Sequence, residues 1–265
     1  MKDGVPPGIE RAAKWILFRS PHTEYVGRCL YRKYLHLYLS YRMFRYCVDD
    51  YEAPIERSRL LWVDPTRIVR VNDPGFFVKR DSICKVMGGD WDEGLPAFED
   101  VFPYDSFEAH FLDAVPWEET EMYEWVKRTI RAGRTWGRCE TMDAAEDRFK
   151  RIDELYHNIK NDGYRTQREL WQNGVDDPFD RDLPPPPERY EIKIDIGRDG
   201  ELIFEDGRHR LAIAKLLGLD SVPVYVLVRH RKWQERRDSY FHSGGRSDVL
   251  HPDLRNLHEP ASKSD

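Results

Sequence analysis

The clearest pattern of hydrophobic and polar positions lies in the second half of the chain. Isoleucines alternate with polar residues over 192–196, and the apolar segment 202–204 follows a Gly-Arg-Asp-Gly turn, which predicts a β-hairpin. Apolar residues recur at helical spacing over 208–217, and a nearly continuous apolar run at 222–228 is typical of a strand covered on both faces. This order places Gly207 at the carboxyl end of a strand, where open α/β sheets commonly bind ligands.

The preceding segments predict one more strand and a helical middle. Leu60 to Ile68 has the pattern of a short strand followed by a Pro-Thr turn. Helical spacing over 117–132 ends at a glycine, and the apolar positions of 149–159 mark one face of a second helix. Asp143, with a glutamate three residues later, predicts the start of that helix. The segment 173–187 ends in four prolines and predicts an extended spacer.

These elements predict an α+β or α/β fold built on a small mixed sheet. We expect an N-terminal helical extension over 1–58 and a sheet-containing domain over 59–230. A helical insertion of that domain covers about 105–172, and a C-terminal helix with a flexible tail covers 231–265.

Composition limits the class of protein. The chain has 265 residues, 40% of them hydrophobic, and a formal net charge of −6. This balance argues against a nucleic-acid binder that works by global positive charge. The four cysteines have no CxxC spacing and do not form a disulfide scaffold. The sequence shows no membrane-spanning run and no secretion signal, so the predicted location is the cytoplasm.

The segment 11–45 combines cationic and aromatic residues. It holds eight Lys or Arg residues against the single acid Glu24, and its Tyr and Leu residues recur at helical steps. One interpretation is a helix that makes peripheral contact with an anionic membrane surface or holds a phosphate backbone. The other is an N-terminal helix that packs on the domain with a cationic outer face.

The turn between the second hairpin strand and its helix is the main candidate site. Asp206 ends the strand, Gly207 permits an unusual backbone conformation, and Arg208, His209 and Arg210 begin the helix. The first amides of a helix and its dipole favour a bound anion, and the cationic side chains add donors. The alternative is a tight turn with exposed cations and no ligand. Three cations at a helix start oppose the dipole, which favours the anion site.

A second candidate is an acidic turn. Two glycines precede Asp90, Asp92 and Glu93, which flank Trp91. Such carboxylates suit a metal ion or a general base near a bound phosphate. The alternative is a polar turn closed by a buried Trp91.

Residues 206–218, followed by Val222-Pro223-Val224, resemble the Asp-Gly-x-His-Arg box of the ParB/sulfiredoxin superfamily, including its ParB-like nuclease domains. The likeness combines the turn, the Ala- and Leu-rich helix, its terminal glycine and the next strand, and it covers about a fifth of the chain. It implies a small mixed sheet of the ParB/sulfiredoxin kind, here with a large helical insertion and an N-terminal helical extension.

The resemblance implies a pocket for the phosphates of ATP or CTP, with Mg²⁺. Gly207 would let a phosphate approach the backbone, His209 and Arg210 would contact its oxygens, and Asp206 would orient the turn or the metal ion. Arg208 stands where sulfiredoxins carry their cysteine, so peroxiredoxin repair is not expected. The residues after 228 are too few for the DNA-binding domain of segregation ParB proteins.

The first functional hypothesis is a nucleotide-binding phosphotransferase or NTP hydrolase acting on a small-molecule acceptor. Its base or metal ligands would be Asp90, Asp92 or Glu93, with His209 and Arg210 stabilising the transferred phosphoryl group. The second is a nucleic-acid-binding or nuclease-like module in which the same cations hold a backbone phosphate. For the basic segment 229–237, one interpretation is contact with nucleic acid and the other is a short solvated helix after the last strand. The third is a non-catalytic nucleotide sensor held at a membrane surface by its N-terminal helix.

Overall fold

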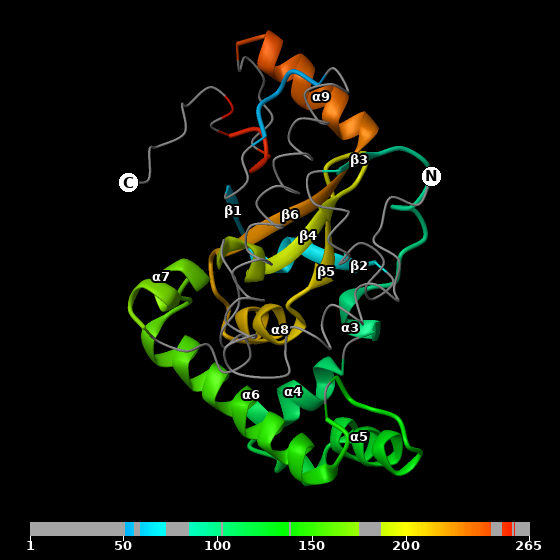
Figure 1. Cartoon of the computed structure of the whole chain (residues 1–265), viewed down its shortest axis with the longest axis vertical. Helices are drawn as coiled ribbons and strands as arrows, with labels where there is room; N and C mark the ends of the chain where they lie inside the picture. The colour runs from blue at the N-terminus through cyan, green and yellow to red at the C-terminus, as the bar shows by residue number, and fades with distance from the viewer. Residues whose placement is uncertain are drawn as a thin grey trace, which may run out of the picture.

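Figure 1 shows the chain as a computed structural model, which describes residues 51–55, 59–72, 85–101, 103–137, 139–174, 187–244, 251–255 and 257. Within these ranges no helix is long and apolar enough to cross a membrane. Apart from residues 51–55, the predicted N-terminal extension, including its amphipathic segment 11–45, lies outside the described residues.

A mixed sheet of six strands forms the centre of the described molecule. The strands are β1 (Leu60–Val63), β2 (Ile68–Val71), β3 (Lys85–Met87), β4 (Ile192–Ile196), β5 (Leu202–Asp206) and β6 (Val222–His230). Their order is β1-β6-β4-β5-β2, and β3 pairs with the carboxyl end of β6. β4 and β5 form the predicted antiparallel hairpin, whereas β4 and β6 run parallel. The predicted mixed α/β class is therefore confirmed.

β6 is the best-covered strand because every one of its positions is buried. Val222, Val224 and Val226 join the main hydrophobic core, while Tyr225, Leu227 and Val228 form a smaller apolar cluster. This burial on both faces explains the nearly continuous apolar run in the sequence. Pro223 lies near the start of the strand, where a missing ladder donor disturbs the sheet least.

The predicted strand at Leu60 ends early and leads to a second strand. Asp64 stops the pairing because its Oδ1 accepts the Thr66 amide at 2.8 Å and so caps the 3-10 turn η1 (Pro65–Arg67). This turn contacts α8 (Arg208–Leu216) and leads to β2. β1 and β2 therefore lie at opposite ends of the strand order.

The helical middle lies between β3 and β4 in the sequence and covers one side of α8 (Figure 1). Its elements are α3 (Phe98–Val101), α4 (Tyr104–Phe111), η3 (Trp117–Glu119), α5 (Glu121–Arg131), α6 (Met142–Asp162) and α7 (Gln167–Gln172), and η4 (Pro187–Tyr190) leads into β4. Threonines cap α5, α6 and α7. The prediction of a start at Asp143 is wrong, because Thr141 accepts the Ala144 amide and caps α6.

The C-terminal region contains the predicted helix, α9 (Arg231–His242), but residues after it also pack on the domain. Asp253 has no exposed surface and accepts hydrogen bonds from Arg229 Nε at 2.9 Å and Trp233 Nε1 at 2.9 Å. Arg237 Nε lies 3.0 Å from the same carboxylate. The prediction of a flexible tail is therefore wrong for residues 251–255, which are held by a buried ion cluster that sequence spacing does not reveal.

A pair of buried carboxyl groups lies within the sheet. Asp195 of β4 is fully buried, and its oxygens accept the Asn72 Nδ2 group at 3.0 Å and the Val228 amide at 3.1 Å. Glu205 of β5 is only 3% exposed. Burial first, and then the nearby Glu205 carboxylate, raise the pKa of Asp195 well above its usual value. Asp195 therefore retains a proton in the folded protein at a pH where the unfolded chain has lost it.

This raised pKa predicts how Asp195→Asn changes stability with pH. The contribution of Asp195 to stability is largest below its unfolded pKa of about 4 and is lost as the pH rises through the folded pKa, at up to about 1.4 kcal/mol per pH unit. Asparagine has no ionisable proton, so the variant lacks this pH dependence. We therefore expect the free energy of unfolding of the variant, relative to wild type, to increase between pH 5 and pH 8 in urea denaturation.

The exposed carboxylate Asp199 provides the control, because it pairs with Arg236 on the surface. Asp199→Asn should give a pH profile parallel to that of wild type. A parallel profile for Asp195→Asn would contradict the assigned protonation.

Candidate functional site

The predicted turn has the geometry of a strand that enters a helix through one left-handed residue. Gly207 has φ +93°, follows β5 and caps α8. A Cβ at this position would lie 3.0 Å from the Ile192 Cα, so glycine is required both by the dihedral angle and by the closeness of β4. The turn therefore brings the first amides of α8 to the carboxyl end of β5.

Asp206 fixes the turn from the strand side. Its Oδ1 accepts the Gly207 amide at 2.9 Å, and its Oδ2 accepts the Lys193 ammonium at 2.6 Å. Lys193 and Asp206 are register partners across the β4–β5 hairpin, which explains why they meet. Burial alone would raise the pKa of Asp206, but Lys193 and the Gly207 amide hold it below its usual value. The structure thus supports the predicted role of Asp206 in orienting the turn.

A cleft of about 920 Å³ opens at this turn, and all five residues from Asp206 to Arg210 line it. Its other walls come from α6, the segment before it and the η4–β4 junction. Four carboxylates and six cationic side chains line the cleft, the cations being Arg148, Lys150, Arg151, Lys193, Arg208 and Arg210. The cleft is therefore locally cationic in a chain whose net charge is −6.

The cationic residues of the turn differ in exposure. Arg208 is exposed at the mouth of the cleft, whereas Arg210 is 8% exposed. The Arg210 guanidinium donates a hydrogen bond to the Tyr190 carbonyl and lies 4.0 Å from Glu191 Oε2. Glu191 in turn accepts the Gln167 amide at 2.6 Å. These contacts tie α8 to the η4–β4 junction, and the predicted contact of Arg210 with phosphate stays a prediction.

His209 lies beneath the turn and is 8% exposed. Its ring stacks on Phe107 of α4 with a centroid distance of 6.0 Å. Burial lowers the pKa of His209 well below its usual value, and the positive charges of Arg148, Arg208 and Arg210 lower it further. The imidazole is therefore neutral at pH 7. A bound anion would oppose these cations and favour the protonated ring.

Sequence analysis missed the wall that faces the turn. Arg148 and Arg151 of α6 line the cleft, together with Trp136 and Cys139 from the segment before the helix. The Cys139 thiol donates to the Ala144 carbonyl at 3.3 Å. The sequence signal for this wall is a pair of arginines three residues apart, which lie on one helix face. The apolar face of the helix predicts the helix but not this cationic face.

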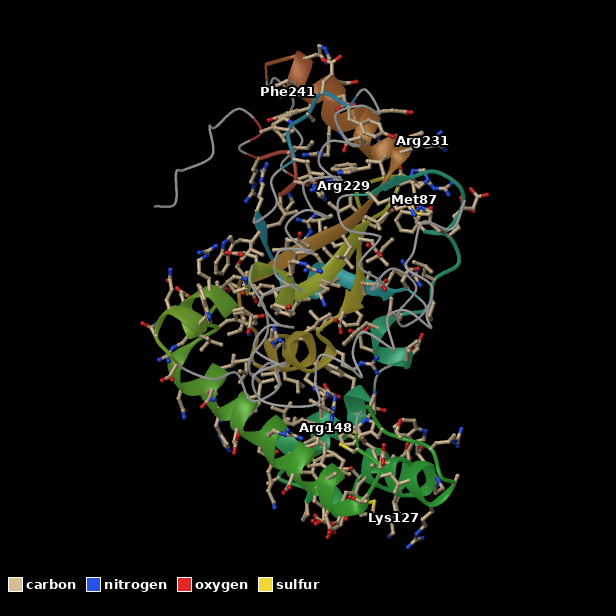
Figure 2. All side chains as sticks on the ribbon, in the orientation of Figure 1. Met87, Lys127, Arg148, Arg229, Arg231 and Phe241 are labelled. Carbon is tan, nitrogen blue, oxygen red and sulfur yellow. The ribbon has the colours of Figure 1, made fainter. Side chains whose placement is uncertain are left out.

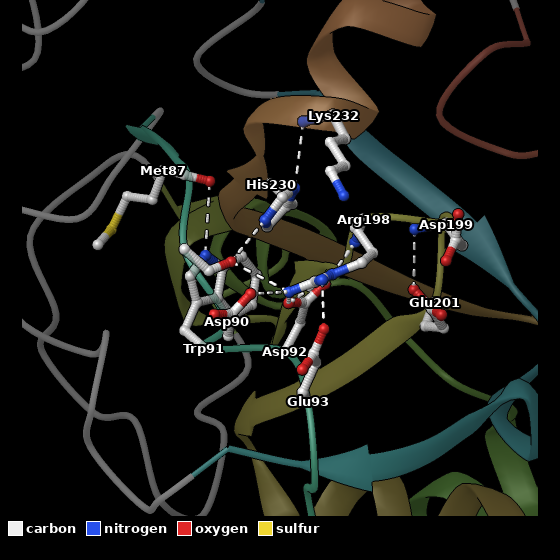
Figure 3. A network of polar contacts seen from close by, with 11 residues as sticks. Met87, Asp90, Trp91, Asp92, Glu93, Arg198, Asp199, Glu201, His230 and Lys232 are labelled. Carbon is white, nitrogen blue, oxygen red and sulfur yellow. Dashed lines mark hydrogen bonds and ion pairs between the residues drawn. The ribbon is translucent and has the colours of Figure 1, made fainter.

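The acidic turn does not line the cleft. Figure 3 shows the polar contacts of this turn, which centre on Arg198. Arg198, just after β4, forms ion pairs with Asp90 at 3.0 Å, with Asp92 at 2.8 Å and with Glu93. Lys193, at the start of β4, marks the cleft end of the same strand. At a rise of about 3.3 Å per residue, roughly 15 Å separates the two ends. The expectation that Asp90, Asp92 and Glu93 lie near a bound phosphate is therefore wrong.

Asp92 is the buried member of this acidic turn, with its side chain 2% exposed. It accepts the Arg198 amide at 2.6 Å and both of its oxygens contact the guanidinium. Burial raises the pKa of Asp92, but the Arg198 hydrogen bonds outweigh it and the net shift is downward. Trp91 is half-buried, and its ring lies 5.8 Å from that of His230. These contacts indicate a structural role for the acidic turn, since they hold it against the β4–β5 hairpin.

The residues at the cleft do not fit a resident Mg²⁺ ion. Within the described ranges no three His, Cys, Asp or Glu side chains are grouped so as to hold a metal. Asp206 is bonded to Lys193, and Glu191 accepts the Gln167 amide at 2.6 Å and the Tyr164 hydroxyl at 3.1 Å. The prediction of Mg²⁺ thus finds no ligand set in this part of the chain.

No protein-family model matches the chain, and comparisons with curated proteins and with solved structures find no match either. The resemblance to the ParB/sulfiredoxin superfamily therefore rests on the residues of the box and on their order in the sequence.

The contacts of the acidic turn predict the effect of Asp92→Asn. One oxygen that accepts from Arg198 becomes an NH₂ group facing other donors, so we expect the free energy of unfolding to fall by about 1 kcal/mol or more. Thermal denaturation measures this loss. Asp90→Asn is the matched control because that side chain is 79% exposed, and it should change stability little. A larger loss for Asp90→Asn than for Asp92→Asn would contradict the assignment.

Proposed function

We propose that the cleft at the Gly207 turn binds a phosphate-bearing small molecule of the nucleotide class, such as ATP or CTP. The observation that carries this proposal is the gathering of cationic groups around the neutral, buried His209. Arg148, Arg208 and Arg210 come from two helices and line the same cleft as His209. The positive charge of each lowers the His209 pKa. Such a cluster is electrostatically unfavourable alone and is stabilised when an anion binds among its members.

The backbone supports the same ligand. A helix N-terminus offers amides that its own turns cannot satisfy, together with the positive end of the dipole. Gly207 and the first residues of α8 line the cleft, so these amides are close to a ligand bound there. Arg208 is exposed at this point and supplies a mobile guanidinium for phosphate oxygens. The cleft volume of about 920 Å³ lies within the range of sites that hold nucleotide-sized ligands.

Phosphoryl transfer to a small-molecule acceptor stays a prediction, because the carboxylates expected to act as base lie at the other end of β4.

Binding of nucleic acid has less support. In the basic segment 229–237, Arg229 and Trp233 contact Asp253 and are buried, so neither is open to a nucleic acid. The exposed cations of the segment are Arg231, Lys232 and Arg236, and Arg236 pairs with Asp199. The membrane-sensor hypothesis depends on residues 11–45, outside the described part of the chain.

Isothermal titration calorimetry tests the proposal with ATP, CTP, adenosine and cytidine. We expect the nucleotides to bind and the nucleosides to bind at least tenfold more weakly, because the phosphates make the main contacts. Arg208→Gln should weaken nucleotide binding about tenfold or more, since it removes a charge-assisted contact.

Lys127→Gln is the control for loss of one positive charge. Lys127 pairs with Glu124 on α5 and does not line the cleft. This variant should bind as wild type does. The proposal is wrong if neither nucleotide binds, if nucleosides bind equally well, or if single-stranded DNA binds much more tightly than ATP and CTP.

A further inference from the structure

The cleft has cations on two walls that come from different parts of the sequence. One wall is the start of α8, with Arg208. The other is α6, where Arg148 and Arg151 lie three residues apart and are half-buried. Residues at this spacing share a helix face, and α6 packs against α8. Figure 2 shows Arg148 on α6, beside α8. The inserted helix thus adds a second cationic wall to the turn.

The position of Arg148 is determined by its neighbours. Its guanidinium lies 4.9 Å from the centroid of the Trp136 ring. Gly137 has φ +62°, and a Cβ there would lie 2.7 Å from the Arg148 Nη1 atom. The guanidinium therefore lies in the space beside Gly137, where a larger residue would displace it, and an aromatic face lies next to it. This packing holds a charged group at the cleft rather than leaving it to extend into solvent.

The two walls act on each other electrostatically. Burial lowers the pKa of Arg148, and the neighbouring Cys139 side chain opposes this shift. The charges of Arg151 on the same wall and Arg208 on the opposite wall also lower the pKa. Arg148 in turn lowers the pKa of His209 at the base of α8. Because the charges repel across the cleft, an anion that contacts both walls relieves more repulsion than one that contacts the α8 wall alone.

We propose that the ligand carries at least two linked phosphate groups, and that Arg148 and Arg151 bind the second one. This inference rests on the proposed function, because the first phosphate occupies the Gly207 turn. The cleft is far larger than one phosphate group, since its volume of about 920 Å³ lies near the upper end of the range for small-molecule sites. One phosphate of a diphosphate would accept hydrogen bonds from the turn amides of the first wall. The other would accept them from the two guanidinium groups of the second wall, so both sets of donors are used. Arg148 and Arg151 would then determine the preference for polyphosphates over monophosphates.

Calorimetry with orthophosphate, pyrophosphate and tripolyphosphate tests this preference. In the wild-type protein we expect pyrophosphate to bind at least tenfold more tightly than orthophosphate. Arg151→Gln should weaken pyrophosphate about tenfold and leave orthophosphate within about twofold, since it removes a contact to the second group only. Arg148→Gln should weaken pyrophosphate more than orthophosphate, because Arg148 also acts on His209 at the first site. Arg208→Gln should weaken both ligands.

Lys160→Gln is the control on the same helix. Lys160 lies over the Tyr156 ring and does not line the cleft, so its loss should leave both affinities unchanged. Arg148→Lys tests the site without removing its charge, and we expect pyrophosphate affinity between those of wild type and Arg148→Gln. Thermal denaturation of each variant identifies any loss that comes from unfolding.

The outcomes separate this inference from the proposed function. If orthophosphate and pyrophosphate bind equally, or if Arg148→Gln and Arg151→Gln weaken both alike, the second phosphate site is wrong while the first stands. If no phosphate ligand binds at all, the proposed function itself is wrong. ATP or CTP binding more tightly than tripolyphosphate identifies a nucleoside polyphosphate as the ligand, whereas equal affinity identifies an inorganic polyphosphate.

Discussion

The left-handed turn at Gly207 is the constraint on which the rest of the structure depends. It lets α8 begin directly after β5, with the Ile192 backbone too close to admit a side chain. The same turn buries the apolar residues of α8 from Leu211 to Ala214 against the sheet and points the first turn of the helix toward α6. The packing of the core and the geometry of the cleft therefore both depend on this turn. A shift of the turn would alter both.

Electrostatics explains why the arrangement favours a ligand. The folded chain brings cations from α6 and α8 to a common cleft and buries His209 among them in its neutral form. At the other end of β4, the Arg198 guanidinium is already balanced by the carboxylates of the acidic turn. The two candidate sites therefore differ, since the acidic turn is neutralised within the protein, whereas six cationic side chains line the cleft against four carboxylates. This excess is the basis of the proposed anion site.

Local patterns made much of the fold predictable. The hairpin, α8 and β6 follow from alternation, helical spacing and a continuous apolar run, all within 192–230. The turn was found because Gly207 and its neighbours are contiguous. The second cationic wall was missed because Arg148 lies 60 positions from Arg208, and nothing in the sequence says which face of α6 meets α8. The prediction for the acidic turn was wrong, and the Asp253 cluster was missed, for the same reason. Both depend on which strand ends lie together in the folded chain, and the sequence does not show this.

The most direct test of the central claim is the protonation of His209, followed by NMR of the imidazole ring as the pH is varied with and without pyrophosphate. The account predicts that the ring is neutral down to an unusually low pH in the free protein. It also predicts that the pKa rises when the anion binds, because the anion opposes the charges of Arg148 and Arg208. A His209 pKa near that of free histidine, or one unchanged by a saturating ligand, would contradict the claim that this cleft is built for phosphate.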